Sequence, residues 1–294
     1  MKTYLDCYPC FLRQALGAAR RAHASVELQR QILLETMDEL RGLPAQASPP
    51  VMAQRIHRIV RRLAHTPDPY GQSKQDATAQ AMTLLPALRE RVRTAPDPLE
   101  SAVRIAIAGN IIDDGAAEEY DLQATLARVL EQPFAIDGMA LLRQALSGAD
   151  TILYLADNAG ETVFDRVLIE TIALPVTYVV KAGPVINDAI RADALAAGLD
   201  AVSHIIDNGS DAPGTLLDDC SPAFREQFAR APLIIAKGQA NYESLSEVRA
   251  PVFFLLQAKC LVIADDLGVP VGSVVLKAPV SMGRWVNDQG EEPS

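Results

Sequence analysis

Polar side chains follow several short apolar segments of the sequence, directly after the point where each segment ends. The first group follows residues 151–155 and consists of Asp157, Asn158 and Glu161. Three further groups follow later apolar segments: Lys181 with Asn187-Asp188, the run Asp207-Asn208-Gly209-Ser210-Asp211, and Lys237 with Gly238. Carboxylate and amide oxygens are the ligands that hard cations such as Mg²⁺ or Mn²⁺ prefer, and lysines suit an anionic substrate such as a phosphate. These residue types predict a divalent cation next to a phosphate-binding position.

Each of these side chains also has a purely structural explanation. Asp157 or Asn158 could cap the helix that follows them, and Asp188 could cap the next helix. Lys237 could extend from the end of its strand into water. A single cap does not account for an adjacent Asp-Asn pair followed by Glu161, and structural roles at every successive group are less expected than one shared site. We therefore favour a functional site.

The elements that must position these residues are short strands that alternate with helices in the second half of the chain. The expected strands are residues 151–155, 176–181, 203–206, 233–237, 252–256 and 272–276. Alternation of strands and helices predicts a parallel, doubly wound sheet, and the right-handed crossover rule places helices on both of its faces. Ligands of such sheets bind at the carboxyl ends of the strands. All four polar groups are therefore expected at the same edge of the sheet.

The first half of the chain has the apolar spacing of helices instead. The expected helices are residues 26–40, 51–64, 73–93, 99–113, 122–130 and 138–146, the third of them kinked or broken near Pro86. We therefore expect an α/β protein. A Rossmann-like three-layer α/β/α catalytic domain with a mainly parallel sheet is expected over residues 149–294, and an all-α N-terminal subdomain over residues 1–148.

Composition narrows the class of protein. The net charge of −10 and the pI near 4.9 argue against a nucleic-acid-binding protein. No apolar run approaches the roughly 20 residues that cross a bilayer, and residues 1–14 lack the apolar core of a signal peptide. These observations predict a cytoplasmic protein with no membrane partner, and oligomerisation stays open.

Cys7 and Cys10 form a C-x-x-C motif with more than one explanation. A structural zinc site needs two more ligands, and Cys220 and Cys260 stand alone in the sequence. A redox motif is expected to follow a strand, and no strand is expected before Cys7. Two reduced thiols at the start of a helix are therefore favoured over a metal or redox role.

Several familiar catalytic motifs are absent from the sequence. There is no G-x-G-x-x-G and no G-x-x-x-x-G-K-[ST], which argues against a dinucleotide or methyl-donor site and against a P-loop. G-x-S-x-G is also missing. A carboxyl methyltransferase stays an alternative, because a Rossmann-like sheet with acidic strand ends can also bind such a cofactor. A non-catalytic phospho-ligand-binding protein is the other alternative.

Five segments of the sequence together resemble one family, the metal-dependent damage-control phosphatases. The segments are LADNAGE, VVKAGPVINDA, IIDNGSDAPGT, IAKGQANYESL and FFLLQAKCLVIADDLGVPVGSVVLK. AGNIID at residues 108–113 and the N-terminal CYPC extend the resemblance over most of the chain, and the leading C-x-x-C is similar to the prokaryotic branch of the family. The resemblance implies a hydrolase that cleaves phosphate esters with a divalent ion.

The resemblance also implies roles for individual residues. The family's metal ligands fall on Asp157, Asn158 and Asp188. Its substrate-phosphate contacts fall on Asn110, Glu161 and Lys237. Lys181 is a further candidate for substrate binding, and catalytic roles are expected for Asp157, Glu161 and Lys237.

The expected substrates are small phosphorylated metabolites, which include sugar phosphates, nucleotides and damaged phosphometabolites. Mg²⁺ or Mn²⁺ is the expected ion, with Ni²⁺ and Co²⁺ as further candidates. Such an ion would polarise the phosphoryl group and activate a water molecule. Covalent attack by Asp157 is the alternative route within the same class of reaction.

Overall fold

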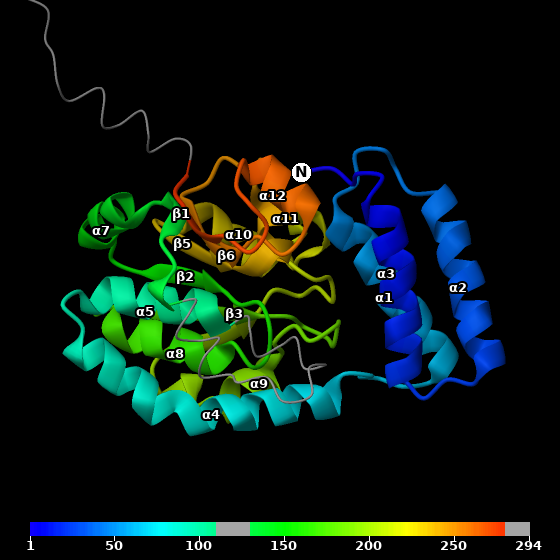
Figure 1. Cartoon of the computed structure of the whole chain (residues 1–294), viewed down its shortest axis with the longest axis horizontal. Coiled ribbons are helices and arrows are strands. Elements are labelled where there is room, and N and C mark those ends of the chain that lie inside the picture. The colour runs from blue at the N-terminus through cyan, green and yellow to red at the C-terminus, as the bar shows by residue number, and fades with distance from the viewer. Residues whose placement is uncertain (110–129, 280–294) are drawn as a thin grey trace, which may run out of the picture.

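One mixed sheet forms the centre of the computed structural model, in which residues 1–109 and 130–279 are described (Figure 1). Its seven strands, all within the described residues, lie in the order β1-β7-β6-β5-β2-β3-β4. Neighbouring strands are parallel except β6 and β7, which are antiparallel. The strands are β1 Phe134–Asp137, β2 Ile152–Leu155, β3 Val176–Val180, β4 His204–Asp207, β5 Ile234–Lys237, β6 Val252–Gln257 and β7 Val274–Lys277. The expected α/β fold with a mainly parallel sheet is confirmed.

Helices cover both faces of this sheet. The helices on one face are α4 Gly71–Thr94, α5 Pro98–Ala108, α8 Thr162–Thr171 and α9 Arg191–Ala196, and those on the other are α10 Pro222–Arg230, α11 Gly238–Leu245 and α12 Leu261–Leu267 (Figure 1). Every residue of β2 and β5 is therefore buried, as is typical of parallel strands covered on both sides. An apolar cluster fills each of the two interfaces between sheet and helices.

Three N-terminal helices form a bundle beside the sheet (Figure 1). They are α1 Cys7–Arg21, α2 Val26–Arg41 and α3 Pro49–Ala64. The bundle has a third apolar cluster of its own, with Ala15, Ile32 and Ile56 fully buried in it. It stands at the end of the sheet where the polar groups that follow β2, β3 and β5 are found.

The structure differs from the sequence-based expectation in two elements. Strand β1, followed by α7 Met139–Gly148, lies in a region expected to be helical, and it pairs with β7 at the edge of the sheet. Every second residue of β1 is exposed, so its apolar signal is weak. Helix α4 continues through Pro86. Pro86 lies on the exposed side of α4, where water can hydrogen-bond the carbonyl group that loses its partner.

Some expectations concern other parts of the chain. Most of the helix expected at residues 122–130, and Asn110, lie outside the described residues. The domain boundary between residues 148 and 149 stays a prediction. In the described residues, no helix is both long and apolar enough to cross a membrane.

Candidate functional site

Several of the predicted polar residues meet at one edge of the sheet. Asp157 and Asn158 follow β2, Lys181 follows β3, and Lys237 is the last residue of β5. These three strands are parallel neighbours, so their carboxyl ends lie at the same edge. All four side chains are buried.

Backbone hydrogen bonds join the two segments that carry the predicted metal ligands. The amide of Ala189 donates to the carbonyl of Asp157 over 2.7 Å, and the amide of Ala159 donates to the carbonyl of Asn187 over 2.8 Å. Asn158 and Asp188 therefore face each other as a β-bridge. The structure thus brings Asp157, Asn158 and Asp188 together, and their role as metal ligands stays a prediction.

These three residues line a cavity of about 640 Å³ between the edge of the sheet and the N-terminal bundle. The facing wall comes mainly from α1, α3 and α4. The cavity is thus closed by helices that precede the sheet in the chain. Its size suits a small-molecule ligand.

Burial and like charge make the two carboxylates unfavourable as free anions. Burial, followed by the charges of Glu161 and Asp188, raises the pKa of Asp157 well above its usual range. Burial also raises the pKa of Asp188, to about 6, although Lys181 and Lys74 partly oppose the shift. A cation between the two carboxylates would reverse both effects.

The acceptor atoms of the site fit a hard divalent cation. Oδ2 of Asp188 is buried and has no hydrogen-bond donor among the described residues, and Nζ of Lys181 lies 3.6 Å from it, which is too long for a hydrogen bond. Asn158 uses its Nδ2 to donate to Oε1 of Glu161 at 2.7 Å and to Oδ2 of Asp157 at 3.2 Å. The amide oxygen of Asn158 is therefore turned away from the carboxylates of Glu161 and Asp157. Together with the carboxylates of Asp157 and Asp188, this oxygen forms a ligand set that Mg²⁺ or Mn²⁺ accepts.

Lys237 and Glu161 lie behind the cavity rather than in its wall. Nζ of Lys237 donates to Oε2 of Glu161 at 2.9 Å and to Oδ1 of Asp165 at 2.6 Å. All three side chains are fully buried. Burial alone would lower the pKa of Lys237, but Asp165 and Glu161 outweigh it and raise the pKa above its ordinary value. Whether Lys237 and Glu161 touch a substrate stays a prediction.

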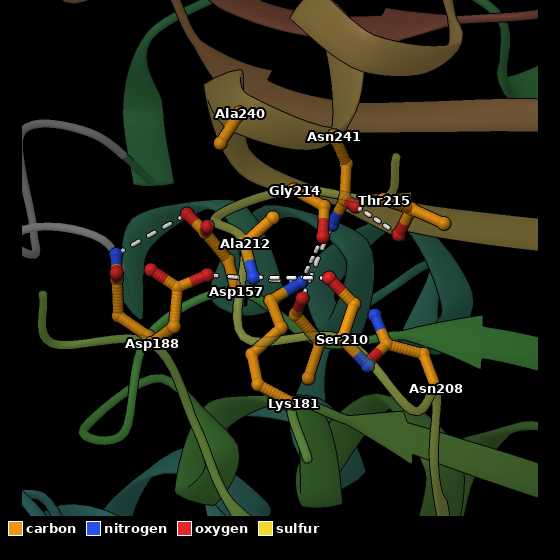
Figure 2. A network of polar contacts seen from close by, with 12 residues as sticks. Asp157, Lys181, Asp188, Asn208, Ser210, Ala212, Gly214, Thr215, Ala240 and Asn241 are labelled. Carbon is orange, nitrogen blue, oxygen red and sulfur yellow. Dashed lines mark hydrogen bonds and ion pairs between the residues drawn. The ribbon is translucent and has the colours of Figure 1, made fainter. Parts of the chain in front are cut away.

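Lys181 lies directly beside Asp188, as Figure 2 shows. Its Nζ donates to the carbonyl of Gly214, which belongs to the loop after β4. The side chain is buried and is absent from the described cavity wall. Lys181 therefore fixes that loop against the predicted metal ligand, and its contact with a substrate also stays a prediction.

The chain is similar in sequence to proteins of one known family. Residues 3–275 match the model of the damage-control phosphatase ARMT1-like domain. The chain belongs to this family. It is 34% identical to a damage-control phosphatase of Archaeoglobus fulgidus, over 94% of this chain and 99% of that protein. It is 35% identical to an uncharacterized protein of Methanocaldococcus jannaschii, over 92% of this chain and 93% of that protein.

A solved structure supports the same relationship. The chain resembles the crystal structure of a DUF89 family protein from Pyrococcus horikoshii, with a TM-score of 0.87 and 31% sequence identity. The match covers 95% of this chain and 99% of the other. The family resemblance that the sequence motifs indicated is therefore confirmed along the length of the chain.

Two residues of the predicted polar group after β4 do not line the cavity of this damage-control phosphatase family member. Asp207 is the exposed last residue of β4. Asp211 binds Arg58 and Arg61 of α3 and so joins the bundle to the loop after β4. The structural explanation fits these two residues better than the functional one.

Several side chains of the cavity wall were not predicted from the sequence. Lys74 and Lys259 line the cavity, and Cys7, Cys10 and Cys260 border it too. Lys74 is buried and pairs with Asp193 at 2.9 Å. A lysine inside a helical segment has no feature in the sequence that separates it from a solvated one. In the described residues, no group of three or more His, Cys, Asp or Glu side chains could hold a metal ion, so the site of Asp157 and Asp188 depends on the amide of Asn158.

Proposed function

We propose that this protein is a divalent-metal-dependent phosphatase that hydrolyses small phosphorylated metabolites, such as sugar phosphates, nucleotides or damaged phosphometabolites. The observation that carries the proposal is the convergence of Asp157, Asn158 and Asp188 in the wall of one cavity, with a buried carboxylate oxygen of Asp188 that accepts no hydrogen bond in the described residues. Membership of the damage-control phosphatase family supports the same reaction class.

Asp157, Asn158 and Asp188 would hold the ion, which would be Mg²⁺ or Mn²⁺, with Ni²⁺ and Co²⁺ as further candidates. When bound, a divalent ion supplies Lewis-acid polarisation of a phosphoryl group and lowers the pKa of a water molecule. Positive side chains in the cavity wall, among them Lys259 and Arg13, suit the remaining charge of the phosphate.

The roles of the surrounding residues follow from their positions. Lys181 keeps the Asp188 segment and the loop after β4 together. Glu161 accepts a hydrogen bond from Asn158 on the side away from the cavity, and Lys237 holds Glu161. Asp157 is either a metal ligand alone or, in the covalent alternative, the nucleophile. Direct contact of Glu161, Lys181, Lys237 or Asn110 with the phosphate is part of the proposal, and Asn110 lies outside the described residues.

Phosphate release is the experiment that tests the proposal. Purified protein is treated with a chelator and then given a sugar phosphate, a nucleotide monophosphate or 4-nitrophenyl phosphate, with and without Mn²⁺ or Mg²⁺. We expect release of inorganic phosphate only with the ion. A protein that binds Mn²⁺ and a phosphoester but releases no phosphate would instead be a phospho-ligand-binding protein. Metal-independent methyl transfer to a carboxylate would identify the methyltransferase alternative.

A further inference from the structure

A continuous chain of buried polar side chains leads from the interior of the sheet to Asn158. The hydroxyls of Tyr154 on β2 and Tyr178 on β3 donate to the two carboxylate oxygens of Asp165 on α8, each at 2.7 Å. Asp165 accepts from Lys237 of β5 at 2.6 Å, and Lys237 donates to Glu161 at 2.9 Å. We name these five residues, Tyr154, Tyr178, Asp165, Lys237 and Glu161, the buried relay.

The relay ends on the amide group of a predicted metal ligand. Oε1 of Glu161 accepts from Nδ2 of Asn158 at 2.7 Å, while Oε2 of the same carboxylate is held by Lys237. If the Asn158 amide were rotated by 180°, its oxygen would face carboxylate oxygens of both Glu161 and Asp157, and the two hydrogen bonds that Nδ2 donates to them would be replaced by contacts between acceptors. Glu161 therefore determines that Asn158 presents its oxygen, the atom that binds a cation, away from the relay.

The composition of the relay goes beyond what packing requires. All five members are fully buried, and two carboxylates and one ammonium group are costly to bury even when they are paired. Apolar side chains could fill the same space between α8 and the sheet at less cost. The members come from β2, β3, β5, α8 and the β2–α8 connection, so the relay ties the position of Asn158 to the rigid centre of the fold.

We infer that the buried relay is a set of positioning residues for the metal site. Tyr154 and Tyr178 hold Asp165, and Asp165 fixes Lys237. Lys237 in turn fixes the carboxylate of Glu161, which orients Asn158. The inference rests on the proposed metal-dependent function and assigns a purpose to Asp165, Tyr154 and Tyr178 that the motifs do not show. Partners that orient the ligands of a metal site commonly contribute about 10- to 100-fold to metal affinity or activity.

The test removes both hydroxyls without changing any charge. In the double variant Tyr154→Phe with Tyr178→Phe, the two rings, which stack with centroids 5.4 Å apart, are retained. Tyr242→Phe is the matched control, because the buried Tyr242 also donates to a carboxylate, that of Asp266 at 2.7 Å, and lies outside the relay. The dissociation constant for Mn²⁺ is measured by electron paramagnetic resonance of free Mn²⁺, and folding by circular dichroism and Tm.

We expect the double variant to bind Mn²⁺ about 10-fold more weakly than the wild type, and Tyr242→Phe to bind it within about twofold, since the control hydroxyl does not reach Asn158. Saturating Mn²⁺ should restore phosphate release by the double variant, because the relay acts on ligand geometry and not on the substrate. If the double variant does not fold, the two single variants are compared, with a loss of about threefold each if both hydroxyls contribute equally.

A folded double variant, or folded single variants, with the Mn²⁺ affinity of the wild type would overturn the inference. A lowered Tm with unchanged affinity would show that the relay only stabilises the fold, which also overturns it. Wild-type protein that binds Mn²⁺ but releases no phosphate would contradict the proposed function alone, and the comparison of Mn²⁺ affinities would still decide the role of the relay.

Discussion

The positive charge of Lys237 is paired with buried carboxylates inside the protein and is not solvated by water. Its two counter-ions, Glu161 and Asp165, are fully buried, so the substitution Lys237→Gln leaves two buried carboxylates without the charge of Lys237. We predict a loss of about 3–5 kcal/mol in the free energy of unfolding. Urea denaturation in the presence of a chelator measures this loss without a contribution from metal binding.

The control for Lys237→Gln is Arg89→Gln, which breaks an ion pair with Glu170 in which both side chains are partly exposed. Such a pair contributes only about 0–1 kcal/mol. If Lys237→Gln cost no more than this control, Lys237 would be free to act at the substrate, as the strand-end position in the sequence first predicted.

The sequence could identify Asp157, Asn158 and Asp188 because each follows a recognisable apolar strand or begins the segment after one. It could not identify Asp165, which lies inside α8 at a spacing where a carboxylate normally faces water. The burial of Asp165 depends on partners from three strands. Those partners are fixed only when the sheet has formed, so no local pattern reveals them.

At the level of elements, the turn from β5 into α11 is built against Asp157. Gly238 has φ of +76°, and a Cβ atom at this position would lie 1.8 Å from Oδ2 of Asp157. Gly238→Ala must therefore displace the Asp157 carboxylate. We predict that Mn²⁺ binding weakens by on the order of 10- to 100-fold, which a Mn²⁺ titration measures.

Gly268→Ala separates this contact from backbone strain. Gly268 also has a positive φ, +69°, but a Cβ atom there would have no neighbour within 4 Å. Both substitutions should cost about 1–2 kcal/mol of stability for the left-handed backbone. Equal Mn²⁺ affinities in the two variants would show that Gly238 does not shape the site.

Strands and helices were predicted best where their patterns are complete. The strands that follow residue 149 are short apolar runs, most of them buried on both faces, and their predicted limits agree closely with the structure. Strand β1 alternates between partly buried and exposed residues and lies between two segments that were expected to be helical, so it was not recognised. Helix α4 continues past Pro86 because Leu85, Leu88 and Val92 are buried, which outweighs the local effect of proline.

At the level of the whole molecule, the N-terminal bundle is joined to the sheet domain through Asp211. Burial alone would raise the pKa of Asp211, but hydrogen bonds from Arg58 and Gln54, together with the charges of Arg58 and Arg61, lower the pKa to about 2. Because the pKa is lowered, the interaction is fully present above the ordinary pKa of 3.8 and is lost as the pH falls through about 2.

This linkage predicts a pH-dependent effect of Asp211→Asn. Above pH 5, the variant should have a lower Tm than the wild type by a constant amount, and the difference should shrink below about pH 4 and become small as the pH falls through about 2. Thermal unfolding between pH 2 and 7 measures the difference. Glu226→Gln, which removes an exposed ion pair with Arg230, is the control and should show almost no difference. A Tm difference for Asp211→Asn that is as large at pH 2 as at pH 7 would exclude the ion pair as its cause.

The two-part architecture could be predicted from the sequence, but the cavity could not. Its walls combine α1, α3 and α4 with the edge of the sheet, and they bring Cys7 and Cys10 to the same cavity as Asp157. Such a surface depends on how the bundle docks onto the sheet, and docking here relies on single side chains such as Asp211. The identity of the facing residues therefore emerges only in the folded chain.

Asp157 is proposed to belong to a metal site at which phosphoesters are hydrolysed. Mn²⁺-dependent phosphate release by the wild type and by Asp157→Ala measures whether it does. The variant should fold at least as well as the metal-free wild type, because it removes a buried carboxylate whose pKa is raised by burial and by neighbouring negative charge. We predict phosphate release by the wild type that requires Mn²⁺, and release by the folded variant at the level of protein-free buffer. Full Mn²⁺-dependent activity in folded Asp157→Ala would exclude Asp157 from the metal site.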